Sequence, residues 1–158
     1  RMSRGLGDVY KRQFQGSTYS VLLDVDKRTI YRKKELPFCL PEPMEEFTIE
    51  AEPSFKARLD FEKVQERRVL NSYIDCLGHV NNCRYGEFAY DVFTDAERKN
   101  LDRLKRMDIY FSHELRNKDV FTILKACAGN KIYVRGYDPA REKIAFDIVM
   151  DFAGDPLI

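Results

Sequence analysis

Hydrophobic and polar positions follow two different periods along this chain. Within residues 82–93, apolar side chains recur at i, i+3, i+4, i+7 and i+8, which is one face of a helix. These residues are Tyr85, Phe88, Ala89, Val92 and Phe93. The pattern predicts a helix with one buried face over residues 82–93, followed by a further turn that Thr94 and Glu97 cap.

Period-two alternation, which is typical of strands, dominates the rest of the C-terminal half. A first strand is expected within residues 61–74, ahead of the helix. Four more candidates follow it, at residues 107–112, 120–127, 132–137 and 144–151. Gly129-Asn130 ends the second of these, and residues 138–141 predict a type I turn. The order of strand, helix and then consecutive hairpin-linked strands predicts an α+β fold whose antiparallel sheet covers one helix.

The N-terminal third has a different organisation. Residues 3–13 resemble a translated sequencing adapter, so we interpret residues 1–13 as a non-native tail; the alternative is a basic tail that belongs to the protein. Residues 18–23 and 29–32 predict a short hairpin, which is too small to be a domain by itself. Residues 36–57 are rich in proline and acidic residues and predict a solvated linker. The regular pattern then occupies residues 58–158.

Composition narrows the possible classes of function. The chain has 158 residues, 44% of them hydrophobic and 34% charged, and a formal net charge of +1, which is typical of a globular domain and argues against a nucleic-acid footprint. No apolar run approaches the roughly 20 residues that a membrane span needs. The four cysteines form no CxxC pair, so no metal site is expected and a reducing, cytoplasmic compartment is the default.

Candidate chemistry concentrates in residues 75–85, where an acid, a glycine, a histidine and two asparagines precede the helix. Asp75 and His79 are titratable, and Gly78 permits a tight turn or a positive φ. Asn81 or Asn82 is expected to be the N-cap of the helix. Each has a structural alternative: a turn acid for Asp75, a backbone-bonded histidine for His79, and capping alone for the asparagines.

This stretch, read as D-x-x-G-H-V-N-N-x-x-Y, resembles the hotdog-fold thioesterases. Residues 110–115, Tyr-Phe-Ser-His-Glu-Leu, resemble the segment of acyl-ACP thioesterases that carries a catalytic glutamate. In that family two hotdog domains share one chain, and the second bears the catalytic residues. The resemblance implies that residues 14–35 are the end of a first hotdog domain, that residues 36–57 are the linker, and that residues 58–158 are the catalytic domain.

The resemblance assigns three catalytic positions, Asp75, His79 and Glu114. Many family members have asparagine two residues after the acid and many plant members have cysteine after the glutamate, but this chain has Leu77 and Leu115. Leu77 brings the motif closer to single-hotdog acyl-CoA thioesterases, in which the acid carries most of the catalysis. Leu115 argues against a cysteine nucleophile. On sequence alone, Glu114 is also read as a solvated charge at a strand end.

Thioester hydrolysis needs an activated water and a stabilised carbonyl oxygen. The sequence-based hypothesis makes Glu114 or Asp75 the base, with His79 orienting it or sharing its proton. Backbone N–H groups near Asn82 and Cys83 are expected to polarise the thioester, and Gly78 and Asn81 complete the predicted substrate contacts. Packing is the alternative role for Cys83.

Three functions compete at this stage. The first is an acyl-ACP thioesterase that releases free fatty acid, with the acyl carrier protein as partner and no cofactor. The second is a hotdog acyl-CoA thioesterase. The third is a non-catalytic module that binds acyl thioesters, because the fold alone does not determine function. An uncovered sheet face or edge also predicts a homodimer through the sheet.

Overall fold

The computed structural model describes residues 16–18, 20, 22–24, 29–31, 38–39 and 49–154. The chain divides into two units, Arg1–Pro53 and Ser54–Ile158. The tail predicted at residues 1–13 lies outside the described residues, as do residues 36–37 and 40–48 of the predicted linker.

A short hairpin is the regular structure described in the first unit. Strand β1 (Leu23–Asp24) pairs antiparallel with β2 (Thr29–Ile30), and the N–H of Tyr31 donates to the carbonyl of Leu22 at 2.8 Å. The pairing agrees with the hairpin predicted from residues 18–23 and 29–32. The paired strands are shorter than predicted, and Asp24 belongs to a strand rather than to the turn.

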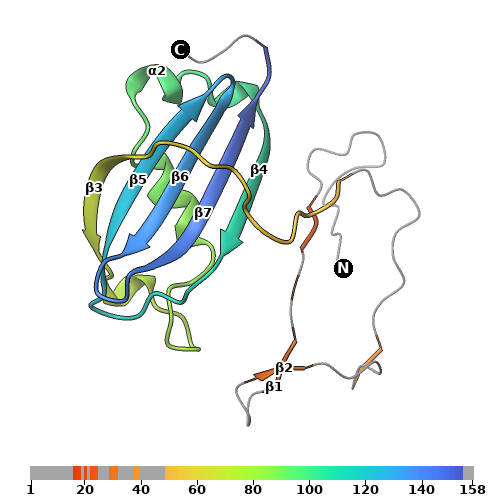
Figure 1. Ribbon diagram of the computed structural model, residues 1–158, viewed down its shortest axis with the longest axis vertical. Helices are drawn as coiled ribbons and strands as arrows, with labels where there is room; N and C mark the ends of the chain where they lie inside the picture. Colours follow the sequence, from red (N-terminus) through yellow and green to blue (C-terminus); the bar gives the residue numbers. More distant parts are fainter. Residues whose placement is uncertain are drawn as a thin grey trace. The chain divides into compact units, whose positions relative to one another are not determined.

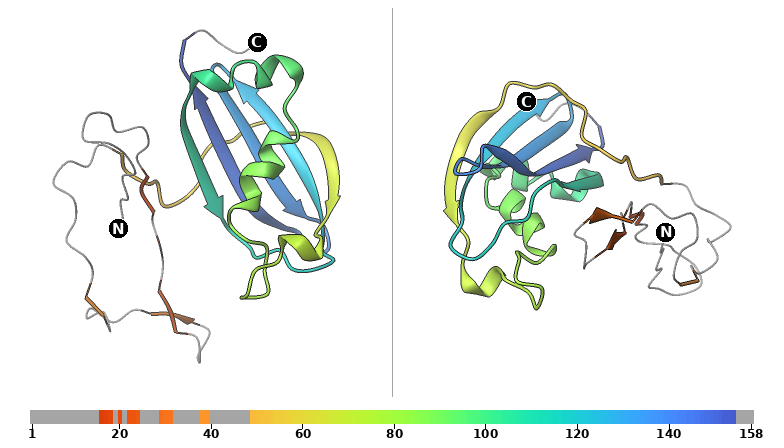
Figure 2. Two further views of the ribbon diagram at one scale, coloured as in Figure 1. Left: turned by 180° about the vertical axis from the view of Figure 1, so that it is seen from behind. Right: turned by 60° about the horizontal axis from the view of Figure 1, so that its bottom comes forward.

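One antiparallel sheet and one helix across it form the second unit. The sheet has the order β3-β5-β6-β7-β4. Its strands are β3 (Glu62–Arg68), β4 (Leu104–Phe111), β5 (Val120–Ala128), β6 (Lys131–Asp138) and β7 (Lys143–Phe152). Figures 1 and 2 show helix α1 (Arg84–Tyr90) lying across one face of this sheet. The α+β architecture that the sequence predicts is confirmed.

The position of β4 differs from the prediction of consecutive hairpins. Strand β4 pairs with β7 at one edge of the sheet, whereas β5 pairs with β3 and β6. Residues 112–119 therefore form a crossing connection between distant strands and not a tight turn. The prediction was wrong because alternation identifies strands but does not say which strands pair. Glu114 consequently lies in the connection between β4 and β5, which runs past β7 and β6 at one end of the sheet.

Helix α1 buries the face that the periodicity predicts, but it is shorter than residues 82–93. Tyr85, Phe88 and Ala89 are buried within it, and Val92 is buried just beyond it. Cys83 is the N-cap residue and makes no side-chain cap, so the prediction of Asn81 or Asn82 at this position was wrong. The buried face packs on the inward side chains of the sheet, which include Phe121, Ile123, Ile132, Val134, Phe146, Ile148, Met150 and Phe152.

The second helix confirms the predicted capping box. In α2 (Asp95–Arg98), the Thr94 side chain accepts from the Glu97 N–H, and the Glu97 carboxylate accepts from the Thr94 N–H. The same carboxylate is buried and accepts from Lys125 Nζ of β5 at 2.5 Å. This ion pair attaches α2 to the sheet. Two short 3₁₀ turns, η1 (Asn71–Tyr73) and η2 (Leu101–Arg103), complete the connections.

The opposite face of the sheet is crossed by residues 54–61, which lead into β3 (Figure 1). The Phe55 ring meets Tyr110 of β4 and Tyr133 of β6 edge-on, with centroids 6.0 and 6.1 Å apart. The Arg135 guanidinium lies 4.4 Å from the Phe61 ring centroid. These aromatic contacts hold the segment on the sheet, so residues 54–61 pack as part of this unit.

Candidate active site

A small closed loop carries the first half of the motif. Residues 74 and 80 form an isolated antiparallel bridge, and between them the Asp75 N–H donates to the His79 carbonyl at 3.0 Å. Gly78 has a φ of 82°, which is the left-handed conformation that glycine adopts without strain, as predicted. The Asp75 side chain accepts from the Leu77 N–H at 2.9 Å. The side chain of Asp75 and the backbone of Gly78 therefore determine this turn locally. The turn holds the residues around them at one end of the sheet.

Asp75 and His79 form a pair inside this loop. Asp75 Oδ2 lies 3.4 Å from His79 Nδ1, and the two side chains are 18% and 24% exposed. The Val80 carbonyl lies 3.3 Å from the same ring nitrogen. Two acceptors therefore face Nδ1, and this arrangement favours the tautomer of the ring that carries its proton on Nδ1. The loop thus holds the imidazole with Nδ1 turned towards Asp75 and the Val80 carbonyl.

The start of α1 follows directly. Asn81 Oδ1 accepts from the Cys83 N–H at 2.9 Å, and the Asn81 carbonyl accepts from the Arg84 N–H at 2.9 Å. The Asn81 side chain therefore caps an orphan amide from a position ahead of the N-cap. Within the described part of the chain, no hydrogen bond occupies the N–H of the exposed Asn82.

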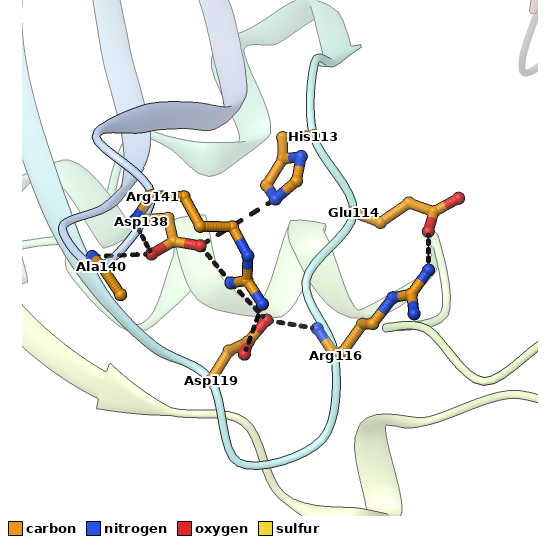
Figure 3. A network of polar contacts seen from close by, with 7 residues as sticks. All are labelled: His113, Glu114, Arg116, Asp119, Asp138, Ala140 and Arg141. Atoms are coloured by element: carbon orange, nitrogen blue, oxygen red, sulfur yellow. Dashed lines mark hydrogen bonds and ion pairs between the residues drawn. The ribbon is translucent and has the colours of Figure 1, made fainter.

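Glu114 approaches this loop from the connection between β4 and β5. The Val80 N–H donates to the Leu115 carbonyl at 2.9 Å, which joins the two segments through their backbones. The Glu114 side chain is 56% exposed, and its Oε2 lies 3.1 Å from an Arg116 guanidinium nitrogen (Figure 3). A cavity of about 260 Å³ adjoins it, lined by His113, Glu114, Arg116 and Arg141. Glu114 thus lies beside the motif loop with one oxygen paired to Arg116.

A buried charge network anchors the same connection from the other side (Figure 3). Arg141 donates to Asp138 Oδ2 at 2.5 Å and to Asp119 at 3.1 and 3.2 Å. Burial raises the pKa of the Asp138 carboxyl, but its bonds from Arg141 outweigh that effect and lower it below its usual value. Asp119 also accepts from the Arg116 N–H at 2.8 Å. The segment that carries Glu114 is therefore fixed at its far end.

The sequence-based assignment of site residues omitted Tyr85, which was read as a core residue. It is 3% exposed. Burial raises the pKa of its hydroxyl to about 12, the charges of Glu114 and Asp75 add to the rise, and the Leu115 backbone partly offsets it. Both candidate acids therefore act on one buried hydroxyl. The available signal was the tyrosine of the motif, a polar-tipped residue in the first turn of a buried helix.

Possible metal ligands, thiols and apolar helices were compared across the described residues. Among them, no cluster of three or more histidine, cysteine or acidic side chains is placed to hold a metal ion. All four cysteines are free thiols, and Cys76 and Cys83 are exposed beside the site. No helix in the part of the chain that the structure describes is long and apolar enough to cross a membrane.

Comparisons with known proteins identify the family and the fold of this chain. Residues 56–150 match the family profile of the acyl-ACP thioesterase C-terminal domain. The chain belongs to the acyl-ACP thioesterase family. This match covers the motif loop, α1, the Glu114 connection and nearly all of the sheet, so the predicted family is confirmed. No curated protein matches the chain.

Solved structures show the fold of this family member. An acyl-ACP thioesterase from Bacteroides thetaiotaomicron superposes with a TM-score of 0.61 at 17% identity, over 83% of this chain and 53% of that one. The chain thus spans about half the length of that relative. A probable thioesterase, YbaW, from Escherichia coli has a TM-score of 0.48 at 17% identity, over 58% of this chain and 81% of that one. A 1,4-dihydroxy-2-naphthoyl-CoA thioesterase from Synechocystis has a TM-score of 0.46 at 10% identity, over 56% and 77%. The sheet around α1 is the hotdog fold, as predicted.

Proposed function

We propose that this protein hydrolyses fatty acyl thioesters of the acyl carrier protein to free fatty acid, in the cytoplasm. The observation that supports this most directly is the backbone bond between Val80 and Leu115, which joins the loop of the Asp75–His79 pair to the segment of Glu114, in a domain of the acyl-ACP thioesterase family. Four free thiols agree with a reducing compartment.

Glu114 is the proposed base for the attacking water. One of its oxygens is paired with Arg116, and in the described structure the other has no protein partner, so it is open to water. Asp75 differs, because one of its oxygens accepts from the Leu77 N–H and the other faces His79. Asp75 therefore orients the imidazole. His79 Nε2 is then available to share the proton of the attacking water or to pass a proton to the leaving thiolate.

The thioester oxygen is proposed to bind at the start of α1. The Asn82 N–H is exposed and unoccupied in the described structure, whereas the Cys83 N–H is already bonded to Asn81. One such donor lowers the barrier by about 3–4 kcal/mol when it meets the developing oxyanion. Asn81 contributes by holding the turn, and Gly78 contributes by leaving open space, since a β-carbon there meets no atom within 4 Å.

Hydrolysis of acyl-CoA is the second candidate. Leu77 favours it, since this side chain is 75% exposed and replaces the asparagine of many acyl-ACP thioesterases. Membership of the acyl-ACP family favours the carrier protein instead.

Self-association is proposed to occur through β4, an edge strand with Met107 and Phe111 half exposed.

The test compares initial rates on an acyl-ACP and on the acyl-CoA of the same chain length, using the wild type, Asp75→Asn and Glu114→Gln. Loss of a positioned base costs about 100-fold or more in kcat, so both variants should lose most turnover while their unfolding curves stay close to wild type. Glu66→Gln is the matched control, because Glu66 is an equally exposed glutamate in an ion pair with Lys63 on β3.

Each outcome of this comparison distinguishes between the candidate functions. Preference for acyl-ACP, with loss of turnover in the two site variants only, would support the proposal. Preference for acyl-CoA would favour the second candidate. Binding of both thioesters without turnover in the wild type would reject hydrolysis and favour a non-catalytic binding module.

A further inference from the structure

The peptide group between Leu115 and Arg116 is held at both of its polar atoms. Its carbonyl accepts from the Val80 N–H of the motif loop at 2.9 Å, and its N–H donates to Asp119 Oδ2 at 2.8 Å. Since the C=O and the N–H of a planar trans peptide point in opposite directions, the two partners hold it from opposite sides. Glu114 is the residue directly before this peptide group. The place where Glu114 meets the motif loop therefore depends on Asp119 as well as on Val80.

Asp119 is itself fixed through its side chain and through its backbone. Arg141 Nη1 lies 3.1 Å from Asp119 Oδ2, and Arg141 Nη2 lies 3.2 Å from Asp119 Oδ1 (Figure 3). Two parallel bonds of this kind set the plane of a carboxylate, which a single contact does not do. The Asp119 N–H donates to the Arg116 carbonyl at 3.1 Å, and the Val69 N–H donates to the Asp119 carbonyl at 2.8 Å. The carboxylate that accepts from the Arg116 N–H is therefore held in one orientation.

A buried acid of the sheet anchors Arg141. Asp138, the last residue of β6, is fully buried, and its Oδ2 accepts from Arg141 Nη1 at 2.5 Å. Its other oxygen accepts from the N–H groups of Ala140 and Arg141 at 3.0 and 3.2 Å, which closes the turn towards β7. Arg141 thus bridges an acid of the sheet and an acid of the connection between β4 and β5, so the end of the sheet determines where Asp119 lies.

We propose that Asp119 and Arg141 are positioning residues for hydrolysis: they orient the peptide group between Leu115 and Arg116, and this sets where Glu114 lies relative to the motif loop. This inference rests on the proposed function, in which Glu114 is the base. The ion pair between Arg116 and Glu114 joins side chains that are 65% and 56% exposed, and such pairs contribute little by themselves. Asp119 therefore acts on Glu114 through the backbone.

The first experiment measures thioester hydrolysis by Asp119→Ala, which removes the acceptor of the Arg116 N–H. A base displaced by about an ångström costs on the order of 100-fold, so kcat should fall to that extent while KM stays unchanged. In the Glu114→Gln background the same change should have almost no further effect, because residues that act as a unit are not additive. Asp119→Asn keeps an oxygen for the Arg116 N–H and should restore much of the activity. An equal loss of kcat with and without Glu114 would overturn the inference.

Arg141→Lys separates positioning from substrate binding, because Arg141 also lines the cavity beside Glu114. Lysine keeps a positive charge near Asp138 but cannot make two parallel bonds to Asp119. The positioning role predicts a loss of at least about tenfold in kcat with KM unchanged. A rise in KM with kcat unchanged would show a direct substrate contact and overturn the role of Arg141. Asp108→Ala is the matched control and should match wild type, because Asp108 also accepts two bonds from one arginine, but on β4.

The last experiment does not depend on activity. Hydrogen exchange of the Arg116 amide, followed by NMR, should speed up at least about tenfold in Asp119→Ala, because this amide loses its acceptor. The Val80 amide should also exchange faster, because the carbonyl to which it donates belongs to the same peptide group, and both amides should be unchanged in Asp108→Ala. An unchanged Val80 amide in Asp119→Ala would overturn the inference. A wild type inactive on every thioester would reject the proposed function, and the exchange rates would still decide whether Asp119 orients this peptide group.

Discussion

Gly136 offers a direct test of the packing beneath the candidate site. It lies in β6 opposite Phe146 of β7. A β-carbon added at Gly136 would lie 2.0 Å from Cε1 of the Phe146 ring, 2.5 Å from Cδ1 and 2.6 Å from Cζ, whereas ordinary contact begins at 3.4 Å. Alanine at this position therefore requires the ring or the strand to move.

The ring has little space into which it can move. Phe146 is fully buried, and its ring centroid lies 4.9 Å from the ring centroid of Tyr85 and 6.0 Å from that of Phe121. Over-packing a core usually costs 1–3 kcal/mol, and three ring carbons are involved here, so Gly136→Ala should lower the free energy of unfolding by about 3 kcal/mol. For a domain of this size that corresponds to a fall in Tm of about 10–20 °C.

The assay is urea unfolding of the full chain, followed by far-UV circular dichroism, for Gly136→Ala, Phe146→Leu and the double variant. Since leucine removes the ring, Gly136→Ala should cost less than about 1 kcal/mol in the Phe146→Leu background. Gly86→Ala is the matched control, because a β-carbon at this helical glycine meets nothing within 4 Å, and it should stabilise by about 0.5–1 kcal/mol. Wild-type stability in Gly136→Ala, or an equal cost in both backgrounds, would refute the steric argument.

Two further predictions concern ionisable groups. Burial raises the pKa of Glu97, but the hydrogen bonds from Lys125 and Thr94 outweigh burial and lower this pKa below 4.5. The stabilisation that the Glu97 carboxylate gives the folded state is therefore present above pH 4.5 and is lost as the pH falls further. Glu97→Gln leaves Lys125 buried without its charge partner and should lower the free energy of unfolding by about 3 kcal/mol at pH 7, measured by urea unfolding. The double variant Glu97→Gln/Lys125→Met should recover part of this loss. Unchanged stability in Glu97→Gln would contradict the argument. Because the folded pKa of Tyr85 is raised from 10.0 to about 12, its contribution is complete below pH 10 and is lost as the pH rises to 12. Wild type should therefore lose on the order of 2 kcal/mol more than Tyr85→Phe across this window, and parallel pH profiles would count against it.

Local pattern was a good guide wherever neighbouring residues decide the structure. The buried face of α1, the capping box of Thr94 and Glu97, and the left-handed turn at Gly78 all followed from residues within a few positions of one another. These features depend on side-chain spacing, one hydrogen bond or one dihedral angle, and each can be read from a short stretch of sequence.

The boundaries of α1 were less accurate, also for a local reason. The sequence expectation began the helix at Asn82, but Asn81 bonds the Cys83 N–H from outside the helix and delays its start to Arg84. Asparagine stabilises both an N-cap and a preceding turn, and the sequence does not distinguish the two.

The helices, the strands and the motif that carries the resemblance can be identified from the order of residues alone. Which of these elements lie side by side depends on contacts between distant parts of the chain. Strand β4 pairs with β7 at the far edge of the sheet, and the connection that follows it joins the Asp75–His79 loop through the bond between the Val80 N–H and the Leu115 carbonyl. Strand pairing depends on the burial of whole sheet faces by residues far apart in the sequence, and no local signal determines it.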